Sequence, residues 1–210
     1  MDSSQQASLE VKELSCSRDD RWLFSGLNFT VSAGQIVLLE GSNGSGKTSL
    51  LRILCGFREA DAGELFWCGQ TIGESSYYQD MAYVGHAEGS KKELTVIENL
   101  RFALALSSPG QQNIAEALKT VQLAGYDDNL VQTLSAGQKR RLSLARLLIT
   151  YNLLWILDEP FTSLDKQGIE LIEQLMAQHI LQGGMIILTS HQDLSLPHLT
   201  LQRIQLDQCH

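Results

Sequence analysis

Residues 41–48 read GSNGSGKT and restrict the possible folds of this chain more than any other feature. They follow an apolar run at 36–39 and precede an apolar pattern at 50–54 that is typical of a helix. Glycines allow a turn in which successive backbone N–H groups face inward, and the following helix directs its positive end at the same point. A strand, this loop and a helix in that order predict a phosphate-binding loop. The alternative is a Gly/Ser loop that matches the pattern by chance, and the flanking elements argue against it.

Two side chains of the loop are suited to a bound nucleotide. Lys47 offers a mobile positive charge to the β- and γ-phosphates, and the Thr48 hydroxyl can ligate Mg²⁺. The loop predicts a nucleotide but does not say which one or how it is used. The candidate nucleotide-binding residues here are Gly41, Ser42, Asn43, Gly44, Ser45, Gly46, Lys47, Thr48 and Ser49.

A second candidate site lies at residues 153–159, where the sequence LLWILDE ends an apolar run with two carboxylates. Ligands collect at the carboxyl ends of parallel strands, so this pair is expected near the phosphate-binding loop. Asp158 is suited to hold Mg²⁺ through water, and Glu159 to orient and deprotonate an attacking water molecule. Taken alone, Asp-Glu before Pro160 is also an ordinary start of a turn.

Hydrophobic periodicity indicates an α/β fold. Residues 27–31 alternate apolar and polar side chains, as on a half-buried strand, whereas 36–39 is apolar throughout, as on a strand covered on both faces. The sheet is therefore expected to be mixed. Further strands are predicted at 81–84, 153–157 and 185–188.

Helical patterns complete the expected α/β arrangement. One runs from Ile169 to Ile180, between two predicted strands. From about 95 to 150 the patterns are helical with no strong strand between them, which predicts a helical lobe inserted into the core. We expect a single domain over residues 1–210.

Composition excludes several classes of function. The chain has 210 residues, and 16 Lys and Arg against 24 Asp and Glu give a net charge of −8, which disfavours nucleic acid as a partner. The longest nearly apolar stretch is far shorter than the roughly 18 to 20 residues of a membrane span, and residues 1–6 lack a secretory signal. We therefore expect folding in the cytosol and no membrane span. Buried reduced thiols are expected at Cys16, Cys55, Cys68 and Cys209.

Residues 134–138 read LSAGQ and precede three cations and an apolar helical pattern. Ser135 is placed to cap that helix, whose free N–H groups favour an anion, and Gly137 has no side chain to keep a phosphate away. In isolation the alternative interpretation of the segment is a helix cap without function. With the loop and the Asp-Glu pair it resembles the signature of ABC-type ATPases. The resemblance implies a P-loop NTPase core with a mixed sheet, an N-terminal antiparallel β portion and an inserted helical lobe.

The family resemblance implies ATP and Mg²⁺ as ligands, and roles for further residues. In that family the signature meets the γ-phosphate held by the loop of another subunit, so we expect a homodimer of ATPase subunits when ATP is bound. It implies that Asp165 contacts the opposite subunit and that His191 contacts the γ-phosphate, which makes Lys47, Glu159 and His191 the expected catalytic residues. The residues implied to contact ATP from the signature are Ser135, Ala136, Gly137 and Gln138.

Two positions depart from the family pattern. ABC ATPases usually have a glutamine that contacts Mg²⁺ where this chain has Gly85 and His86. We hypothesise that His86 replaces it as a metal or water contact, which would make turnover depend on pH between roughly 6 and 7. In many members of the family an aromatic side chain stacks on adenine, at a position that corresponds to residues 16–18 of this chain. Here the Arg18 guanidinium is a candidate, and solvated surface is an equal alternative.

A closer resemblance narrows the expected function. The sequences LSAGQKRRLSLARL and LLWILDEPFTSLD, with Gly85, His86 and His191, resemble the ATP-binding subunits of bacterial cytochrome c maturation systems. This implies integral membrane transporter subunits as partners, a peripheral place on the cytoplasmic face of the inner membrane, and ATP hydrolysis coupled to haem handling or haem-chaperone release. The alternatives are a soluble ABC ATPase assisting iron-sulfur assembly, a module that binds ATP with negligible turnover, and a P-loop kinase.

Overall fold

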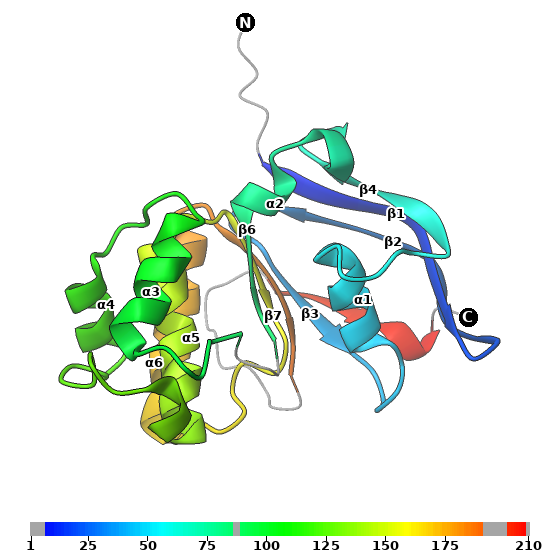
Figure 1. Cartoon of the computed structure of the whole chain (residues 1–210). Helices are drawn as coiled ribbons and strands as arrows, with labels where there is room; N and C mark the ends of the chain where they lie inside the picture. The colour runs from blue at the N-terminus through cyan, green and yellow to red at the C-terminus, as the bar shows by residue number, and fades with distance from the viewer. Residues whose placement is uncertain (1–6, 86–88, 191–200, 209–210) are drawn as a thin grey trace, which may run out of the picture.

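The computed structural model describes residues 7–85, 89–190 and 201–208. Its strands are β1 (Ser8–Arg18), β2 (Arg21–Ser32), β3 (Ile36–Glu40), β4 (Ala62–Trp67), β5 (Gln70–Thr71), β6 (Met81–Val84), β7 (Leu154–Leu157), β8 (Met185–Thr189) and β9 (Leu201–Gln205). Its helices are α1 (Lys47–Leu54), α2 (Tyr77–Asp80), α3 (Val96–Ala105), α4 (Ile114–Thr120), α5 (Ala136–Ile149) and α6 (Lys166–Leu181), with short 3₁₀ turns η1 (Ile72–Glu74), η2 (Val131–Thr133) and η3 (Leu206–Gln208). Figure 1 shows two sheets with α1 between them and α3 to α6 gathered beside one of them.

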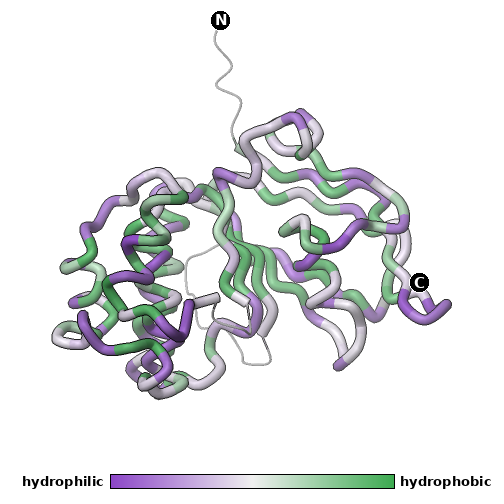
Figure 2. The backbone as a smooth tube through the Cα atoms, in the orientation of Figure 1, coloured by the Kyte–Doolittle hydropathy of each residue, from purple (hydrophilic) through white to green (hydrophobic). Residues whose placement is uncertain are grey.

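A five-stranded parallel sheet, in the order β6-β7-β8-β3-β9, forms the centre of the molecule. The unbroken apolar sequences of β3, β7 and β8 are buried on both faces, as predicted, and colour the centre of Figure 2 as hydrophobic. Successive residues of β3 face opposite cores: Ile36 and Leu38 face the helices, whereas Val37 and Leu39 face α1 and the second sheet. The strands predicted at 81–84, 153–157 and 185–188 are confirmed within one residue at each end.

The second sheet is antiparallel, with the order β2-β1-β4-β5. Along β2, Leu27, Phe29 and Val31 are buried, whereas Asn28 and Thr30 are exposed, which confirms the predicted alternation. The expected combination of parallel and antiparallel strands is present, and it is divided between two sheets. The division arises because β1 pairs along its length with β2 and β4, which places all three in one antiparallel layer.

Helix α1 fills the space between the two sheets. It packs in one core with Phe24 of β2 and with Val37 and Leu39 of β3. The residues that it buries are Leu50, Leu51, Ile53 and Leu54. Since α1 follows β3 through the loop at 41–46, this packing fixes both ends of the predicted phosphate-binding loop.

Helices α3, α4, α5 and α6 cover the other face of the parallel sheet (Figure 1). The first three lie in the stretch where the sequence predicts helices. Each begins with a capping box, in which a side chain of the cap residue and a Glu or Gln three positions later satisfy each other's backbone N–H. The pairs are Thr95 with Glu98, Asn113 with Glu116, and Ser135 with Gln138. The predicted cap at Ser135 is therefore confirmed.

The last described segment returns the chain to the centre of the molecule, and the sequence did not predict it. Strand β9 pairs in parallel with β3, so that Ile204 lies opposite Leu39 and Gln205 opposite Glu40. The 3₁₀ turn η3 therefore lies beside the start of the phosphate-binding loop, where Asp207 contacts Ser42.

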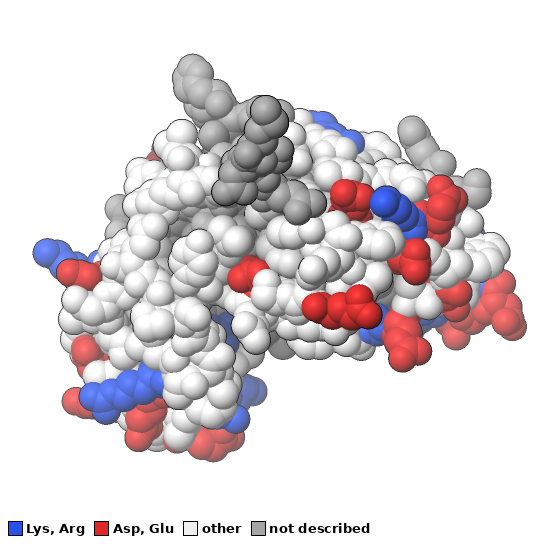
Figure 3. All heavy atoms as spheres, turned by 90° about the horizontal axis from the view of Figure 1, so that it is seen from above, with Lys and Arg blue, Asp and Glu red and all other residues white. Residues whose placement is uncertain are grey.

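The surface and the thiols agree in part with expectation. Figure 3 shows mostly acidic side chains at the end that carries the antiparallel sheet, whereas acidic and basic side chains are mixed at the helical end. Among the described residues, no helix combines the length and apolar character that a bilayer span requires. Cys16 and Cys55 are buried as predicted, whereas Cys68 is only half-buried. The fourth predicted thiol, Cys209, lies outside the described residues.

Candidate functional site

The loop at residues 41–46 has one packed side and one open side. Gly41, Gly44 and Gly46 have φ angles of 148°, 87° and 99°, a region that favours glycine. A Cβ atom on Gly46 would lie 2.9 Å from the Cβ atom of Leu23, so the loop is pressed against β2. A Cβ atom on Gly44 would meet nothing within 4 Å. The loop therefore has open space for a ligand beside Gly44.

Lys47 holds its charge across the loop. Its ammonium donates to the carbonyl oxygens of Gly41 at 2.7 Å and of Ser42 at 3.0 Å. The lysine side chain is flexible, and water can replace the ammonium as the donor to these carbonyl oxygens. The ammonium therefore lies at the loop and can move from these carbonyl oxygens to bind an anionic ligand.

Other polar groups of the loop lack protein partners. The Ser45 hydroxyl is buried and accepts or donates no hydrogen bond within the described ranges. The backbone N–H groups of Gly44 and Gly46 also have no acceptor among the described residues. Such groups cost free energy unless a ligand or water binds them. They fit the phosphate oxygens of a nucleotide.

A cavity of about 320 Å³ lies against the loop. It is lined by Arg18, Leu23, Asn43, Gly44, Gly46, Lys47, Thr48, Ser49, Asp158 and Glu159. The structure therefore brings the predicted loop and the predicted carboxylate pair together, and it adds Arg18 to the same wall. The Arg18 side chain is 71% exposed and lies 3.5 Å from Asp19, so both alternatives for its role stay open.

Asp158 is fixed at the end of β7. It is 4% exposed, and its carboxylate accepts from the Thr189 hydroxyl at 2.8 Å. Burial, with the Asp158 carboxylate nearby, raises the pKa of Cys55 and of Tyr83 to about 12. Both neighbours therefore stay protonated at neutral pH.

Glu159 has a left-handed backbone, with a φ of 49°. This conformation costs a non-glycine residue about 1–3 kcal/mol and persists only where the surroundings hold it. The Glu159 N–H donates to the Thr189 hydroxyl at 2.9 Å, and its carbonyl accepts from Arg140 at 2.5 Å. The direction of the Glu159 side chain is therefore determined by two residues that the sequence did not single out.

Arg140 connects the signature helix to the carboxylates. It lies in α5, is 4% exposed, and also donates to the carbonyls of Pro160 at 3.0 Å, Gly85 at 2.9 Å and Asp158 at 3.0 Å. A guanidinium has several donors in a rigid plane, which suits this array of acceptors. The carbonyl of Gly85 belongs to the segment just before His86, so Arg140 joins three parts of the site.

The signature segment at 134–138 lies at the start of α5, away from the cavity of the same chain. Ser135 and Ala136 are exposed, and none of residues 135–138 lines the cavity. A Cβ atom on Gly137 would lie 3.0 Å from the carbonyl oxygen of Ser163, so glycine also allows close packing of α5 on the loop before α6. The exposed helix start is open to a ligand from outside the chain.

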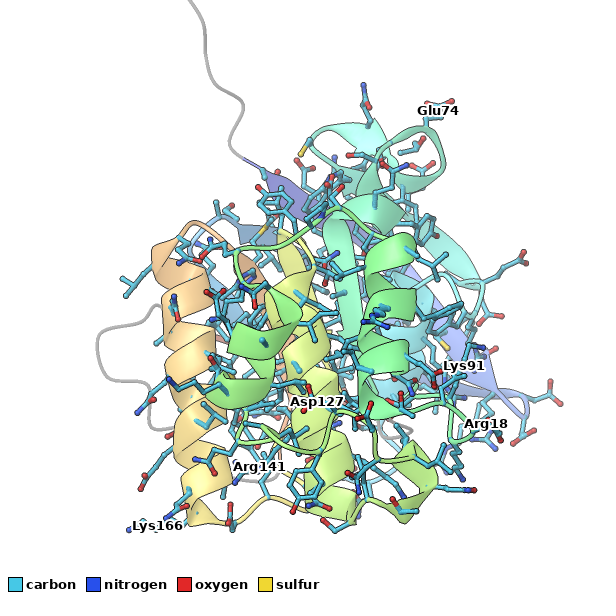
Figure 4. The ribbon with its side chains drawn as sticks, turned by 60° about the vertical axis from the view of Figure 1, so that its left-hand side comes forward. Arg18, Glu74, Lys91, Asp127, Arg141 and Lys166 are labelled. Carbon is cyan, nitrogen blue, oxygen red and sulfur yellow. The ribbon has the colours of Figure 1, made fainter. Side chains whose placement is uncertain are left out.

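Asp165 caps α6 and pairs with Arg141 of α5. Its carboxylate accepts from the Gly168 N–H at 2.8 Å and lies 3.1 Å from the Arg141 guanidinium. The Gly168 hydrogen bond, with Arg141 beside it, holds the pKa of Asp165 below its ordinary value. Figure 4 shows Arg141 and Lys166 at the end of the molecule where α5 and α6 begin. The structure thus gives Asp165 an intrachain role beside the one that the family resemblance implies.

Two predicted residues, His86 and His191, lie outside the described residues. Two further residues were missed by sequence reasoning. Thr189 ends the apolar run of β8 with a hydroxyl, and Arg140 is four positions before the buried Leu144 on the inward face of α5. The sequence shows Thr189 as a polar residue that ends an apolar run, whereas Arg140 is one of three consecutive cations and its burial has no signal in the sequence.

The residues of the cavity fit MgATP. The Thr48 hydroxyl and the Asp158 carboxylate both line it, and oxygen ligands are those that Mg²⁺ prefers. The described ranges hold no group of three His, Cys, Asp or Glu that could bind a metal alone. A magnesium ion here would therefore depend on phosphate and water oxygens for its remaining ligands.

Comparisons with known proteins agree with this geometry. The family model described as ABC transporter matches residues 24–162. The chain is 50% identical over 202 residues, 95% of its length, to the cytochrome c biogenesis ATP-binding export protein CcmA of Escherichia coli strain K12 and of Shigella sonnei strain Ss046, and covers 97% of each.

Solved structures show the same fold. The ATP binding subunit of an ABC transporter matches with a TM-score of 0.81 and 26% identity, over 87% of this chain and 79% of that one. A bacterial Atm1-family ABC exporter with ATP bound matches with a TM-score of 0.80 and 22% identity, over 96% of this chain and 37% of that one. The chain therefore belongs to the ABC transporter family and is one of its ATP-hydrolysing members.

Proposed function

We propose that this chain hydrolyses MgATP in sites shared by two copies and thereby drives a membrane export complex in cytochrome c biogenesis. The observation that carries the shared-site proposal is that the signature segment is separate from the cavity within one chain. The cavity contains the phosphate-binding loop and both carboxylates, but none of residues 135–138. A signature that faces outward requires a second copy to complete the site.

The chain's own residues divide the chemistry between them. Lys47 and the loop N–H groups bind the phosphates, and Thr48 with Asp158 holds Mg²⁺, which neutralises phosphate charge when bound. Glu159 orients the attacking water and accepts its proton, in a direction held by Thr189 and Arg140.

The partner copy supplies the remaining contacts. Its Ser135–Gln138 capping box leaves the first N–H groups of α5 and the positive end of the helix facing the γ-phosphate. Asp165 stabilises the adjoining segment. In the complete site His191 contacts the γ-phosphate, as the family resemblance implies. His86 stands where this chain departs from the family pattern, and we propose that it contacts metal or water there. Closure of the dimer is driven by contacts that form only when ATP is held between the copies.

The biological role rests on the relatives. Both named CcmA proteins are cytochrome c biogenesis export proteins, and the match spans almost the whole of each chain. We propose integral membrane transporter subunits of that system as partners, the cytoplasmic face of the inner membrane as the location, and haem handling or haem-chaperone release as the coupled step. The comparisons give no support to the iron-sulfur alternative.

The shared-site proposal is tested with Ser135→Arg. The long cation blocks the helix start, so MgATP binding by the single chain is expected to persist while turnover falls by about a hundredfold. Asn113→Arg is the matched control, because Asn113 makes the same capping box on α4 and lies far from the signature. Phosphate release measures turnover, and normal turnover in Ser135→Arg would contradict shared sites.

The biological proposal needs a separate experiment in cells. Bacteria that depend on this chain for cytochrome c are expected to lose covalently bound haem in their c-type cytochromes when Lys47→Ala replaces the parent. Haem staining of membrane proteins measures the loss. Purification of the tagged parent in mild detergent is expected to bring integral membrane subunits with it. Full maturation with the Lys47 variant would contradict the role.

A further inference from the structure

The C-terminal segment makes a row of side-chain contacts to the start of the phosphate-binding loop. Gln205 donates to the Glu40 carboxylate at 2.6 Å, and Arg203 forms an ion pair with the same carboxylate. Glu40 is the last residue of β3 and directly precedes the loop. Alternate residues of β9 thus face Glu40, and η3 continues the row.

Asp207 makes the closest approach to the loop itself. Its carboxylate accepts from the Ser42 backbone N–H at 2.7 Å and from the Ser42 hydroxyl at 2.8 Å, across 165 positions of sequence. A Cβ atom on Gly41 would lie 3.3 Å from the same carboxylate. Two hydrogen bonds to one residue define the orientation of the Ser42 peptide, which a single bond would not.

The other side of Ser42 contacts Lys47. The Ser42 carbonyl accepts from the Lys47 ammonium at 3.0 Å, so Asp207 and Lys47 both contact Ser42, one at its N–H and one at its carbonyl. The Ser42 N–H shares one peptide group with the Gly41 carbonyl, which accepts from the same ammonium at 2.7 Å, so a rotation of that group would move a carbonyl that locates Lys47. The position of the phosphate-binding charge is therefore connected to the last turn of the described chain.

We propose that Asp207 is a positioning residue for ATP binding, which acts through Ser42 on the loop and on Lys47. The inference rests on the proposed role of the loop as the phosphate site. Asp207 touches no substrate atom in this scheme, and its negative charge would repel a triphosphate. Its contribution must therefore come from ordering the loop before ATP arrives, which reduces the entropy lost on binding.

Two substitutions separate the hydrogen bonds from the charge. Asp207→Ala removes both contacts to Ser42. Asp207→Asn keeps an oxygen that accepts from the Ser42 N–H and an amide that donates to the Ser42 hydroxyl, and it loses the charge. Because Ser42 and Asp207 are exposed, we expect MgATP to bind about fivefold more weakly to the alanine variant and within about twofold of the parent to the asparagine variant.

The experiment measures MgATP binding by calorimetry and the steady-state KM and kcat of the full chain. Asp207→Ala is expected to raise Kd and KM together and to leave kcat and the thermal unfolding midpoint near the parent's. Asp127→Ala is the matched control, since that carboxylate accepts from the Gly125 N–H at 3.2 Å, in the loop after α4. It is expected to bind MgATP as the parent does.

The outcomes distinguish this inference from the proposed site. Unchanged binding by Asp207→Ala, or an asparagine variant as weak as the alanine variant, would overturn the positioning role. A fall in kcat or in the unfolding midpoint without a rise in Kd would also overturn it. Lys47→Ala is measured in parallel. Normal binding by that variant would instead reject the loop as the phosphate site.

Discussion

Replacing Arg140 with methionine is expected to destabilise the chain and to slow ATP hydrolysis. Arg140 is 4% exposed and donates to four carbonyl oxygens, those of Gly85, Asp158, Glu159 and Pro160. Methionine retains an unbranched apolar stem but has no donor. The substitution therefore leaves main-chain acceptors unpaired where the two carboxylates are held.

Two opposing effects set the magnitude. Each carbonyl oxygen that loses its donor costs about 1–3 kcal/mol, so the four together cost about 4–12 kcal/mol. Removing the guanidinium also removes a desolvation penalty of several kcal/mol. We expect a net loss of about 3 kcal/mol in the free energy of unfolding. This is less than the roughly 5–15 kcal/mol typical of a domain, so the variant is expected to fold.

Urea unfolding compares Arg140→Met with Lys139→Met, which removes a half-buried cation one position earlier. The control is expected to change the free energy of unfolding by less than about 0.5 kcal/mol. Folded Arg140→Met is expected to release phosphate at least about tenfold more slowly, because Glu159 loses a contact that holds its left-handed backbone. An Arg140 variant as stable as the control, or as active as the parent, would refute the reasoning.

Three further substitutions test other parts of the structure. Thr189→Val keeps the shape but removes the hydroxyl that accepts from the Glu159 N–H, so phosphate release is expected to fall about tenfold while urea unfolding shows a loss of about 1–2 kcal/mol. Burial lowers the pKa of His179 to about 4, so the parent is expected to lose stability as the pH falls from about 6.5 to about 4. His179→Gln, which cannot titrate, should give a flatter curve of urea midpoint against pH in that window, and an unchanged slope would contradict the shift. Gly46→Ala forces a φ of 99° on alanine and a Cβ atom within 2.9 Å of Leu23, so calorimetry is expected to detect no MgATP binding.

The parts that sequence predicted well are those in which local patterns and packing agree. The run at 36–39, the glycine loop and the apolar face of α1 are consecutive in sequence, and each restricts the next. The cap at Ser135 is similarly local, since its partner Gln138 is three positions away. Periodicity and short-range hydrogen bonds therefore sufficed to predict the strand, the loop and both helix starts.

The parts that sequence missed depend on long-range pairing. Strand β9 buries only Ile204 among its five residues, so its sequence carries no apolar alternation, and its existence depends on an exposed edge of β3. Asp207 reaches Ser42 across 165 positions, and no local pattern indicates that contact. Three consecutive cations at 139–141 resemble a solvated helix face. Only the packing of α5 shows that Arg140 faces the core.

The contacts of Arg140 also bear on communication between the two proposed sites. Ser135 and Arg140 lie within two turns of one another at the start of α5. A displacement of the helix start at Ser135 is therefore expected to move the Arg140 guanidinium. The guanidinium holds the carbonyls of Asp158 and Glu159, and the helix start packs on the carbonyl oxygen of Ser163, which a Cβ atom on Gly137 would approach to 3.0 Å. In the proposed dimer, contact of the signature with ATP in the partner copy is therefore expected to change the free energy of the carboxylates in the same chain, and thermodynamic linkage makes such a coupling reciprocal. ATP hydrolysis is expected to be cooperative in the parent, and the Hill coefficient of Arg140→Met is expected to fall toward one, because the methionine variant lacks the connection through which the sites are coupled.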